Sequence, residues 1–411
     1  MSTFDKIIGY ETIKEELMQI CDMFQNRGKY DDIGAKPING ILIYGNAGVG
    51  KTTLAECFVE ECGVNSYIVD KSFDLYKFAE NFSDFFEEVR ANAPAVVLLD
   101  DLDDFTEPIH NILQVEFDSI VDLDVVVIAT AKDSDKIPDQ LLRAGRFDRR
   151  IEMYLPTMQE RGQLFEYFLK DKKTDSINYE DLTMMCADCS CADVKSIVNE
   201  AAINAAFSGR KEIGMKDLVE VCLKHEYVSP DSCTSASKDD LRKTALHEAG
   251  HLVINEILCP DSVGLVSART EDGFTRRCKD LPRILYEVIV SLGGKAAVEL
   301  YYAETCASGC QSDIRKAFRK LRLSMNDSGT CGIGMIDVDS FGIGMSESMN
   351  ARNEAVVHAE MEKCLFKARD ILLKNREFLE KATNLLLEKK YLLHSDIKTL
   401  KESLTITNVA V

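Results

Sequence analysis

No stretch of this sequence is long and apolar enough to cross a membrane as a helix, which takes about 18 or more consecutive uncharged residues. The most apolar segment, 281–300, is interrupted by Arg283, Glu287, Lys295 and Glu299. A secretion signal is also missing, because residues 1–5 lead directly into a polar helical pattern. We therefore expect a soluble, cytoplasmic protein with no membrane span in this chain.

Basic residues are in the minority, since 49 lysines and arginines face 69 acidic residues and give a formal net charge of −20. Binding to a nucleic-acid backbone needs a basic surface, so nucleic acid is not expected as the main partner. The 14 cysteines occur in a long chain without a secretion signal, which favours reduced thiols over disulfides. The cluster Cys186, Cys189 and Cys191 has no second C-x-x-C pair to complete a zinc site, so structural cysteines are the better interpretation.

Histidine is scarce, and two of the six histidines lie in one pentapeptide, 247–251. The surrounding apolar residues recur at helical spacing. Positions i and i+4 share one face of a helix, so His247 and His251 can present two imidazoles to one metal ion. Glu248 lies beside them, where a carboxylate can accept a proton from a metal-bound water. On this motif alone, a chance pentapeptide or two solvated histidines is the alternative.

A glycine-rich loop, 45–52, follows a short buried strand at 40–44 and precedes a predicted helix at 53–62. It fits G-x-x-x-x-G-K-T, in which glycines let backbone N–H groups curl around phosphates. Lys51 reaches the terminal phosphates, and the Thr52 hydroxyl binds magnesium. The motif in this context predicts a site for ATP and Mg²⁺. Its candidate binding residues are Gly45, Asn46, Ala47, Gly48, Val49, Gly50, Lys51, Thr52 and Thr53.

Two further buried strands, 95–99 and 125–129, alternate with helical patterns and indicate a parallel α/β sheet. Asp100 follows the first of them, where a carboxylate suits the second magnesium contact of P-loop enzymes. The alternative for Asp100 and Asp101 is a solvated acidic turn. Four arginines lie within 143–150. They form either a solvated basic turn or arginine fingers that reach a neighbouring subunit's nucleotide.

Pro156 closes this α/β domain, and the pattern from 157 to about 225 is helical. Residues 227–237 have the composition of a linker. The helix with the two histidines follows, and Ser237 with Asp240 predicts a capping box at its start. The remainder is predicted to hold a strand or hairpin at 263–278, helices at 282–302, 313–325, 351–374 and 376–388, and a glycine-rich mobile loop at 329–348.

A P-loop ATPase followed by an H-E-x-x-H helix, in this order and spacing, resembles the FtsH family of AAA+ zinc metalloproteases. The matching segments are 8–9, the P-loop, 95–101, 141–149, 198–202, 247–251 and 308–314. The resemblance implies a multidomain fold. It comprises an α/β P-loop AAA+ ATPase domain with a parallel sheet (1–156), a small helical AAA+ lid (157–232) and a mostly α-helical zinc metallopeptidase domain (233–411).

The resemblance also implies roles for residues of the motor. Ile8 and Gly9 match the adenine-side backbone contacts. Arg146 and Arg149 match the arginine fingers that act on the ATP of the adjacent subunit. Asp101 stands at the position of the acidic residue that places the attacking water.

Asp313 matches the third zinc ligand of the family. Catalytic zinc usually takes three protein ligands, which makes a carboxylate plausible beside two histidines. Ser312 is a predicted helix N-cap, which would place Asp313 in the first turn of a helix. A carboxylate that only complements the helix dipole is the alternative for Asp313. Glu299 is the second candidate ligand, at a spacing that other zincins use.

The motor departs from the family pattern at several positions. Family members usually have two transmembrane helices at the N-terminus, and this chain starts where they would end. Asp101 replaces the usual Glu, and Ala131 stands where a polar sensor residue is usual. No glycine occurs between residues 63 and 145, so the aromatic pore motif is not recognisable, and Tyr76 or Phe78 is its candidate.

We therefore predict a homohexameric ATP-dependent zinc endopeptidase that acts on unfolded or ATP-unfolded proteins and uses Zn²⁺, ATP and Mg²⁺. Because Asp101 is short and Ala131 is apolar, we expect tight ATP binding with slow turnover, unless Thr130 or Lys132 replaces the lost contacts. One alternative is a nucleotide-assembled ring with a weak motor, whose peptidase acts on chains that are already unfolded. Another is an AAA+ chaperone with structural zinc, which would have no need of Glu248 as a base.

Overall fold

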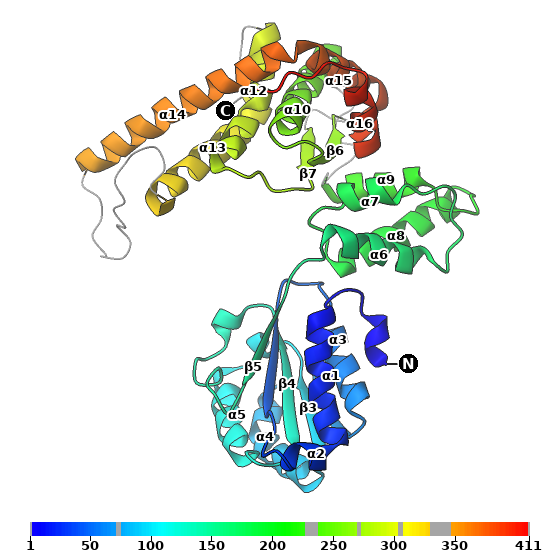
Figure 1. Ribbon diagram of the computed structural model, residues 1–411, viewed down its shortest axis with the longest axis vertical. Helices are drawn as coiled ribbons and strands as arrows, with labels where there is room; N and C mark the ends of the chain where they lie inside the picture. Colours follow the sequence, from blue (N-terminus) through cyan, green and yellow to red (C-terminus); the bar gives the residue numbers. More distant parts are fainter. Residues whose placement is uncertain are drawn as a thin grey trace. The chain divides into compact units, whose positions relative to one another are not determined.

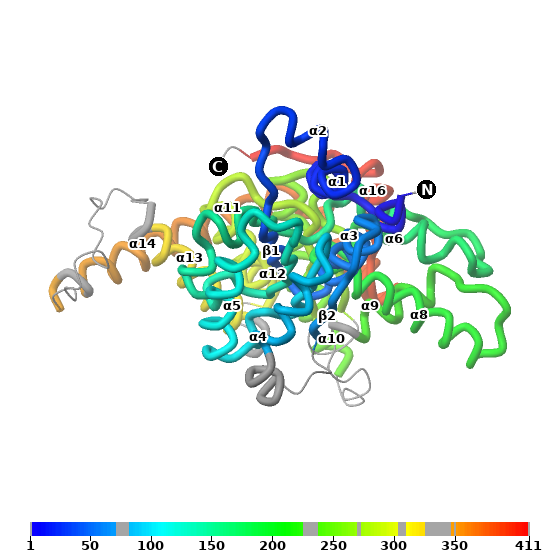
Figure 2. Tube along the Cα trace, turned by 90° about the horizontal axis from the view of Figure 1, so that it is seen from below, coloured from blue at the N-terminus to red at the C-terminus, as the bar shows by residue number. Residues whose placement is uncertain are grey.

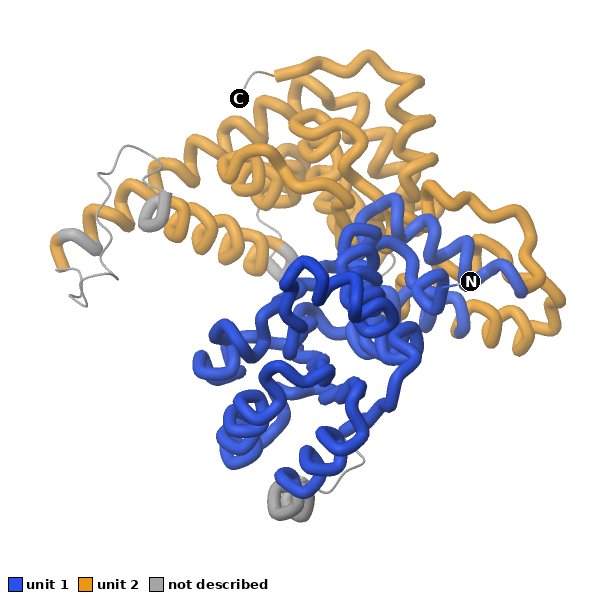
Figure 3. The backbone as a smooth tube through the Cα atoms, turned by 60° about the horizontal axis from the view of Figure 1, so that its bottom comes forward, with its two compact units in different colours: residues 1–171, 188–199 blue, residues 172–187, 200–411 orange. Residues whose placement is uncertain are grey.

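The computed structural model describes residues 2–70, 75–226, 237–268, 273–302, 307–328 and 347–409 (Figure 1). It forms two compact units: residues 1–171 with 188–199, and residues 172–187 with 200–411 (Figure 3). The predicted helical lid at 157–232 therefore contributes to both units. Within the described ranges, no helix has the length and apolar character needed to span a bilayer.

A five-stranded parallel sheet forms the centre of unit 1, with the strand order β2-β3-β4-β1-β5. Its strands are β1 (Gly40–Gly45), β2 (Asn65–Val69), β3 (Ala95–Leu99), β4 (Val125–Ala131) and β5 (Arg149–Met153). Every residue of β3 and β4 is buried, as expected for parallel strands that are covered on both faces. The predicted strands at 40–44, 95–99 and 125–129 are confirmed, whereas β2 and β5 were not predicted.

Helices cover both faces of this sheet (Figure 1, Figure 2). Because side chains alternate along a strand, Val96 and Leu98 pack with α1 and α3, whereas Val97 and Leu99 pack with α4 and α5. The helical segments of unit 1 are η1 (Thr3–Lys6), α1 (Glu11–Gln25), α2 (Arg27–Asp31), α3 (Lys51–Cys62), α4 (Leu75–Ala91), η2 (Leu102–Asp104), α5 (Glu107–Ser119), η3 (Ser134–Lys136) and α6 (Met158–Leu169). The helix α8 (Cys191–Phe207) begins in unit 1 and ends in unit 2.

Unit 2 is built around the helix α10 (Lys238–Leu258), in which every residue from 245 to 257 is buried. Ser237 and Asp240 form the predicted capping box at its start. The other elements are α7 (Tyr179–Met185), α9 (Met215–Glu226), β6 (Val263–Ser267), β7 (Phe274–Arg277), α11 (Ile284–Ser291), α12 (Gly293–Tyr302), α13 (Ala307–Ser328), α14 (Glu347–Lys374), α15 (Arg376–Lys389), β8 (Tyr391–Leu393) and α16 (His394–Glu402). The strands form a three-stranded sheet with the order β7-β6-β8, in which both pairs are antiparallel.

Two glycines allow α12 to pack tightly against α10. A Cβ atom on Gly250 would lie 2.5 Å from the carbonyl oxygen of Gly293, and a Cβ on Gly293 would lie 3.0 Å from that of Gly250. Neither contact leaves room for a larger side chain. The close approach brings the N-terminal end of α12 against the face of α10 that carries His247 and His251.

Several predicted boundaries differ from the structure. The helix predicted at 282–302 is two helices, α11 and α12, which are separated at Leu292. The prediction that Ser312 caps a helix is wrong, because α13 begins at Ala307 and Asp313 lies in its interior. The loop at 329–348 lies almost wholly outside the described residues, as do 227–236 and 269–272. Tyr76 and Phe78 lie in α4, but their side chains are outside the described part.

Candidate metal and nucleotide sites

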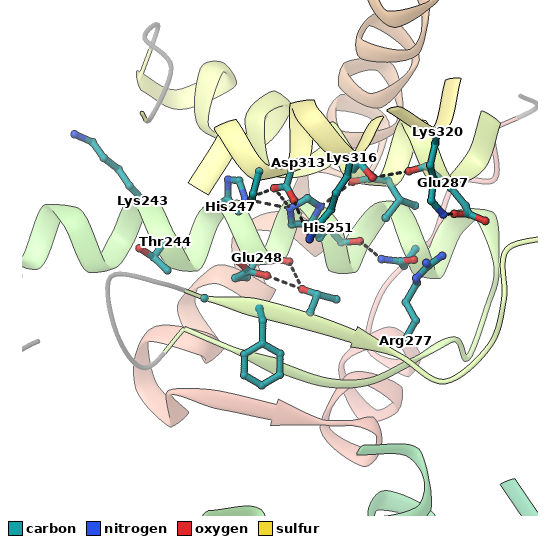
Figure 4. A pocket seen from close by; sticks show the side chains of 17 residues that line it. Lys243, Thr244, His247, Glu248, His251, Arg277, Glu287, Asp313, Lys316 and Lys320 are labelled. Carbon is teal, nitrogen blue, oxygen red and sulfur yellow. Dashed lines mark hydrogen bonds and ion pairs between the residues drawn. The ribbon is translucent and has the colours of Figure 1, made fainter. Parts of the chain in front are cut away.

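Three predicted metal ligands converge in unit 2. His247 and His251 project from one face of α10, and Asp313 approaches them from α13 (Figure 4). The Nε2 atoms of the two histidines lie 3.0 Å apart, and each lies 3.1 Å from Oδ2 of Asp313. In the described part of the chain, these three residues form the one cluster of histidine, cysteine or acidic side chains that could hold a metal ion.

The spacing of the three atoms fits zinc. Ligand atoms on a tetrahedral zinc lie roughly 3.3–3.4 Å apart when the zinc–ligand bonds are about 2.0–2.1 Å. The observed separations of 3.0 and 3.1 Å are within a few tenths of that spacing. Two imidazoles and one carboxylate leave a fourth position open, as catalytic zinc sites do.

The surroundings of the cluster fix its ligands in the form that a cation requires. Nδ1 of His251 donates a hydrogen bond to the carbonyl of Val290 at 2.7 Å, which leaves its Nε2 facing the cluster. Burial acts to raise the pKa of Asp313, but hydrogen bonds from His247 and His251 hold it well below its ordinary value. Asp313 is therefore an anion at neutral pH.

Glu248 lies beside the cluster and is buried, with 4% of its surface exposed. Burial raises the pKa of its carboxyl above the ordinary value, against the influence of the two histidines and of a hydrogen bond from Thr275. The Thr275 hydroxyl, on β7, donates that bond to Oε2 at 2.8 Å. A raised pKa suits a group that must accept and then release a proton near neutral pH.

Glu299, the second candidate ligand, is engaged elsewhere. Its carboxylate pairs with Lys295 on its own helix and with Arg369 on α14. It does not take part in the cluster of possible ligands. Among the cysteines, Cys186 lies with its sulfur 3.4 Å from that of Cys222, and neither belongs to a metal-binding cluster within the described residues.

A cleft of about 590 Å³ opens over the cluster (Figure 4). The strand β7, the helices α10 and α11, and the helix α13 supply its walls. His247, Glu248, His251 and Asp313 all line it. The cleft is large enough to admit an extended peptide segment rather than only a water molecule.

Sequence reasoning missed the residues that support this site. Thr275 and Val290 hold Glu248 and His251, and a Cβ atom on Gly294 would lie 2.3 Å from the His247 ring. The pair Gly293–Gly294 was the one usable signal, since adjacent glycines in an apolar segment indicate close helix packing. Thr275 and Val290 carry no such signal, because their contacts are made across the fold.

The nucleotide loop in unit 1 has the predicted shape. Gly45, Gly48 and Gly50 adopt positive φ angles of 137°, 77° and 103°, which suit glycine, and α3 begins at Lys51. The Lys51 ammonium group donates to the carbonyls of Gly45 and Asn46 at 2.7 and 2.8 Å. Burial lowers the pKa of Lys51, although Asp101 and Asp103 act in the opposite direction.

Asp100 joins the P-loop to the neighbouring strand β4. Its Oδ1 accepts hydrogen bonds from the hydroxyls of Thr52 and Thr130, at 2.8 and 2.7 Å. Thr130 also accepts a bond from the backbone N–H of Asp101 at 2.8 Å. Thr52 and Asp100 therefore lie together, as the predicted magnesium contacts require.

Asp101 and Ala131 lie at the carboxyl ends of two neighbouring strands, β3 and β4. Ala131 is fully buried, so its position contributes no polar group. The ammonium group of the next residue, Lys132, lies 3.5 Å from Asp101 and 3.2 Å from Asp104. Thr130 and Lys132 could replace the polar contacts that are lost at positions 101 and 131. Both of them contact the turn that contains Asp101.

The segment that holds Ile8 and Gly9 joins η1 to α1. Gly9 has a φ of 78°, and a Cβ atom there would lie 2.2 Å from the carboxylate of Glu160. The next residue, Tyr10, has its pKa raised by burial and by nearby Cys191 and Glu160. Cys191 in turn donates to the carbonyl of Val49 in the P-loop at 3.6 Å. The segment thus lies close to residues that contact the P-loop.

Arg146 and Arg149 lie at the opposite end of the sheet from the P-loop of their own chain. Arg149 pairs with Ile41 at the start of β1, while the P-loop begins after Gly45, about 13 Å further along the strand. Arg149 forms an ion pair with Glu16 at 3.3 Å, and Arg146 forms one with Asp118 at 3.3 Å. Neither side chain is placed to act on the nucleotide of its own subunit.

Comparison with known proteins identifies the ATPase half. Residues 41–155 match the family model described as "ATPase family associated with various cellular activities (AAA)". Residues 176–220 match the model of the AAA+ lid domain. These matches confirm the predicted AAA+ fold of the first half of the chain.

Similarity to individual proteins extends much further. "ATP-dependent zinc metalloprotease FtsH 3" of Symbiobacterium thermophilum is 29% identical, over 98% of this chain and 71% of its own length. The FtsH proteins of Caldicellulosiruptor bescii and Thermus thermophilus are each 28% identical, over 97% and 98% of this chain and 72% and 71% of their own lengths. The resemblance predicted from the motifs is confirmed along nearly the whole chain.

Proposed function

We propose that this chain, an AAA+ ATPase similar to FtsH zinc metalloproteases along nearly its whole length, is an ATP-dependent zinc endopeptidase. The observation that carries the proposal is the meeting of His247, His251 and Asp313 beside Glu248 in one cleft. A purely structural zinc site needs no general base, so it would not require the buried carboxylate of Glu248 beside the three ligands. A complete P-loop in the same chain supplies the ATP-dependent half of the activity.

The peptidase residues have separate tasks. Zinc held by His247, His251 and Asp313 would supply Lewis acidity, which polarises a peptide carbonyl and lowers the pKa of water. Glu248 accepts the proton of the attacking water and passes it to the departing amine. Thr275 fixes the orientation of Glu248 through its hydrogen bond, and Val290 fixes the tautomer of His251.

The ATPase residues hold the phosphates and the magnesium ion. Lys51 and the backbone N–H groups from Gly45 to Thr53 bind the phosphates, while Thr52 and Asp100 hold magnesium. Ile8 and Gly9 contact the adenine side. Asp101 places the attacking water, either directly or through one further water.

The active ATPase is a homo-oligomer, and by resemblance a hexamer. Arg146 and Arg149 cannot serve their own nucleotide, because they lie at the far end of the sheet. They act in trans on the adjacent subunit after releasing Asp118 and Glu16. The substrates are protein chains that reach the cleft unfolded or are unfolded by ATP hydrolysis.

A ring with a weak motor is the second candidate, and Asp101 with Ala131 favours it. A misplacement of about 1 Å can cost on the order of 100-fold in rate. Asp101 is one methylene shorter than the usual Glu and also lies beside Lys132. In this version ATP binding assembles the ring, and the peptidase cleaves chains that are already unfolded.

Casein degradation in three nucleotide conditions tests the proposal. With ATP, unfolded casein should be cleaved, and cleavage should fall without nucleotide. If a non-hydrolysable analogue supports casein cleavage as well as ATP does, and a stably folded protein survives, the weak-motor version holds. Absence of cleavage in every condition by zinc-loaded protein would show that the proposed peptidase function is wrong.

A further inference from the structure

The cleft over the candidate zinc site is rich in positive charge at one end. Arg277 on β7 and Lys320 on α13 line that end, while Lys243 and Thr244 lie at the other (Figure 4). Glu287 on α11 is the acidic side chain beside them, and it pairs with Lys320. In a chain with a net charge of −20, this local excess of cations is contrary to the overall composition.

Arg277 is the cation of this group that lacks an acceptor. Its Nη1 atom is buried and has no hydrogen-bond partner among the described residues, and no described acidic side chain pairs with it. Leaving a buried donor without an acceptor is unfavourable, and more so when the group is charged. The rest of the Arg277 side chain is partly exposed and lines the cleft, where its guanidinium group can turn toward a ligand with an acceptor oxygen.

Lys320 has its own acidic neighbours, Glu287 and Asp280, at this end of the cleft. Burial lowers the pKa of its ammonium group, the positive charge of Arg277 lowers it further, and Asp280 acts in the opposite direction. Glu287 is already paired with Lys320. Among the described cations that line this end of the cleft, Arg277 is therefore the one without an ion-pair partner.

The strand β7 sets the distance between Arg277 and the peptidase residues. Alternation places Thr275 and Arg277 on the face toward the cleft, whereas Arg276 donates to the carbonyl of Met185 on α7. Thr275 is the residue that holds Glu248. The Cα atom of Arg277 therefore lies about 7 Å along the strand from that of Thr275, two residues away. In the described sheet, β7 is an edge strand, beside which an extended peptide can lie.

We propose that Arg277 is a specificity-determining residue that binds an acidic side chain of the substrate, about two residues from the scissile bond. This proposal rests on the peptidase function proposed above. A carboxylate fits because a guanidinium group donates two parallel hydrogen bonds to it. The alternative is a water that links Arg277 to Oδ1 of Asn255, a second buried atom without a partner among the described residues. In that case the charge of the substrate would not matter.

A set of quenched fluorescent peptides tests the proposal. Each peptide carries one Glu at a different position within three residues of a single scissile bond, and its matched partner carries Gln there. The readout is the ratio of kcat/KM for Glu over Gln, measured with the zinc-loaded oligomer. Wild type should prefer Glu by about tenfold or more at one position on one side of the bond, since hydrogen bonds to charged groups are the strong ones. The preference should shrink at high salt.

Three variants assign the preference to its residue. Arg277→Gln should bring the ratio close to one, while Arg277→Lys should keep part of it, because the charge remains and the paired donors are lost. Lys243→Gln is the matched control, since it removes a cleft cation at the other end and should leave the ratio unchanged. Zinc content measured for each variant verifies that its site is assembled.

The possible outcomes separate this proposal from the peptidase function itself. If neither the wild type nor any variant cleaves any of the peptides, the proposed peptidase function is wrong. Cleavage with a wild-type ratio near one, or with a ratio that survives Arg277→Gln, would overturn only the role of Arg277. If Arg277→Gln fails to bind zinc, two other measurements decide between the outcomes. They are the Glu-over-Gln ratio of kcat/KM for Arg277→Lys and the salt dependence of that ratio for the wild type.

Discussion

At the scale of single residues, Asp313 distinguishes the candidate zinc site from a pair of helix histidines. Its carboxylate is within 3.1 Å of both imidazoles and remains ionised because those imidazoles bond to it. Glu299 was the second candidate, as another carboxylate downstream of the motif, but it forms ion pairs with Lys295 and Arg369. Position in the fold, rather than residue type, decides between the two.

The first prediction compares these two carboxylates. Asp313→Asn should weaken zinc binding by at least about 10-fold, because an amide is a far poorer ligand than a carboxylate. Glu299→Gln is the matched control and should retain one zinc per subunit. Metal analysis after dialysis measures both. Loss of zinc from Glu299→Gln together with its retention in Asp313→Asn would reverse the assignment.

The second prediction concerns Asp101. If its short side chain limits hydrolysis, Asp101→Glu should raise steady-state ATP turnover, whereas the affinity for ATP should change little because the P-loop and Asp100 are intact. Lys132→Ala should also alter turnover, since this lysine lies beside Asp101 and Asp104. Fast wild-type turnover that Asp101→Glu leaves unchanged or lowers would mean that the site has adapted to Asp.

At the scale of secondary-structure elements, the contact between α10 and α12 sets the geometry of the zinc site. Gly250 and Gly293 approach so closely that a Cβ atom on Gly250 would lie 2.5 Å from a carbonyl oxygen. Gly294 lies directly against the ring of His247. The two helices therefore act as one support for the ligands.

The third prediction follows from this packing. Gly250→Ala should add up to about 1 kcal/mol to the free energy of unfolding through helix propensity. It should lose more than it gains, because overpacking typically costs about 1–3 kcal/mol and the added Cβ meets the backbone of Gly293. We expect a lower melting temperature and weaker zinc binding. Gly214→Ala is the control, since a Cβ atom there would meet its nearest neighbour at an ordinary 3.7 Å. Equal stability of both variants would show that α10 and α12 can move apart at no cost.

The elements that could be predicted are those whose own residues carry a strong pattern. The buried strands 40–44, 95–99 and 125–129 are nearly uninterrupted apolar runs, and the capping box at Ser237 is local. The strands β2 and β5 were missed because their sequences, NSYIV and RRIEM, mix polar and charged residues and are partly exposed. The helix around Asp313 was placed too late because Ser312 offers a cap signal that the longer helix α13 overrides.

The metal site was accessible from sequence only in part. His247, Glu248 and His251 are adjacent in the chain, so helix periodicity alone placed them together. Asp313 lies 62 residues beyond His251 in the sequence and was found through resemblance, because no local pattern links the two. Arg277 was not predicted at all, since its significance depends on a buried atom in a cleft formed by distant elements.

At the scale of the whole molecule, the proposed function assigns a motor and a peptidase to the two halves, and we propose that Arg146 and Arg149 reach a neighbouring subunit. Arg146 and Arg149 lie at the end of the sheet opposite to their own P-loop. Their ion pairs with Asp118 and Glu16 are internal to the subunit, and assembly would exchange them for contacts with a neighbouring nucleotide. Assembly should therefore depend on protein concentration and on ATP.

The fourth prediction tests these shared sites. Lys51→Ala subunits and Arg146→Ala/Arg149→Ala subunits should each hydrolyse ATP poorly alone, because each lacks one half of a composite site. Mixing them should restore part of the activity through interfaces that pair an intact P-loop with intact arginines. Sedimentation of the wild type should show an oligomer under assay conditions. A monomer with full ATPase activity would exclude action in trans.

The proposed function makes one chain both an ATPase and a zinc peptidase whose base is Glu248. The most direct test is casein cleavage by Glu248→Gln, with zinc measured on the same sample. We predict that this variant keeps one zinc per subunit and hydrolyses ATP as the wild type does, but loses at least about 100-fold in cleavage, as expected for removal of a general base. Cleavage at the wild-type rate by Glu248→Gln, or a wild-type protein that binds no zinc, would show that the proposed function is wrong.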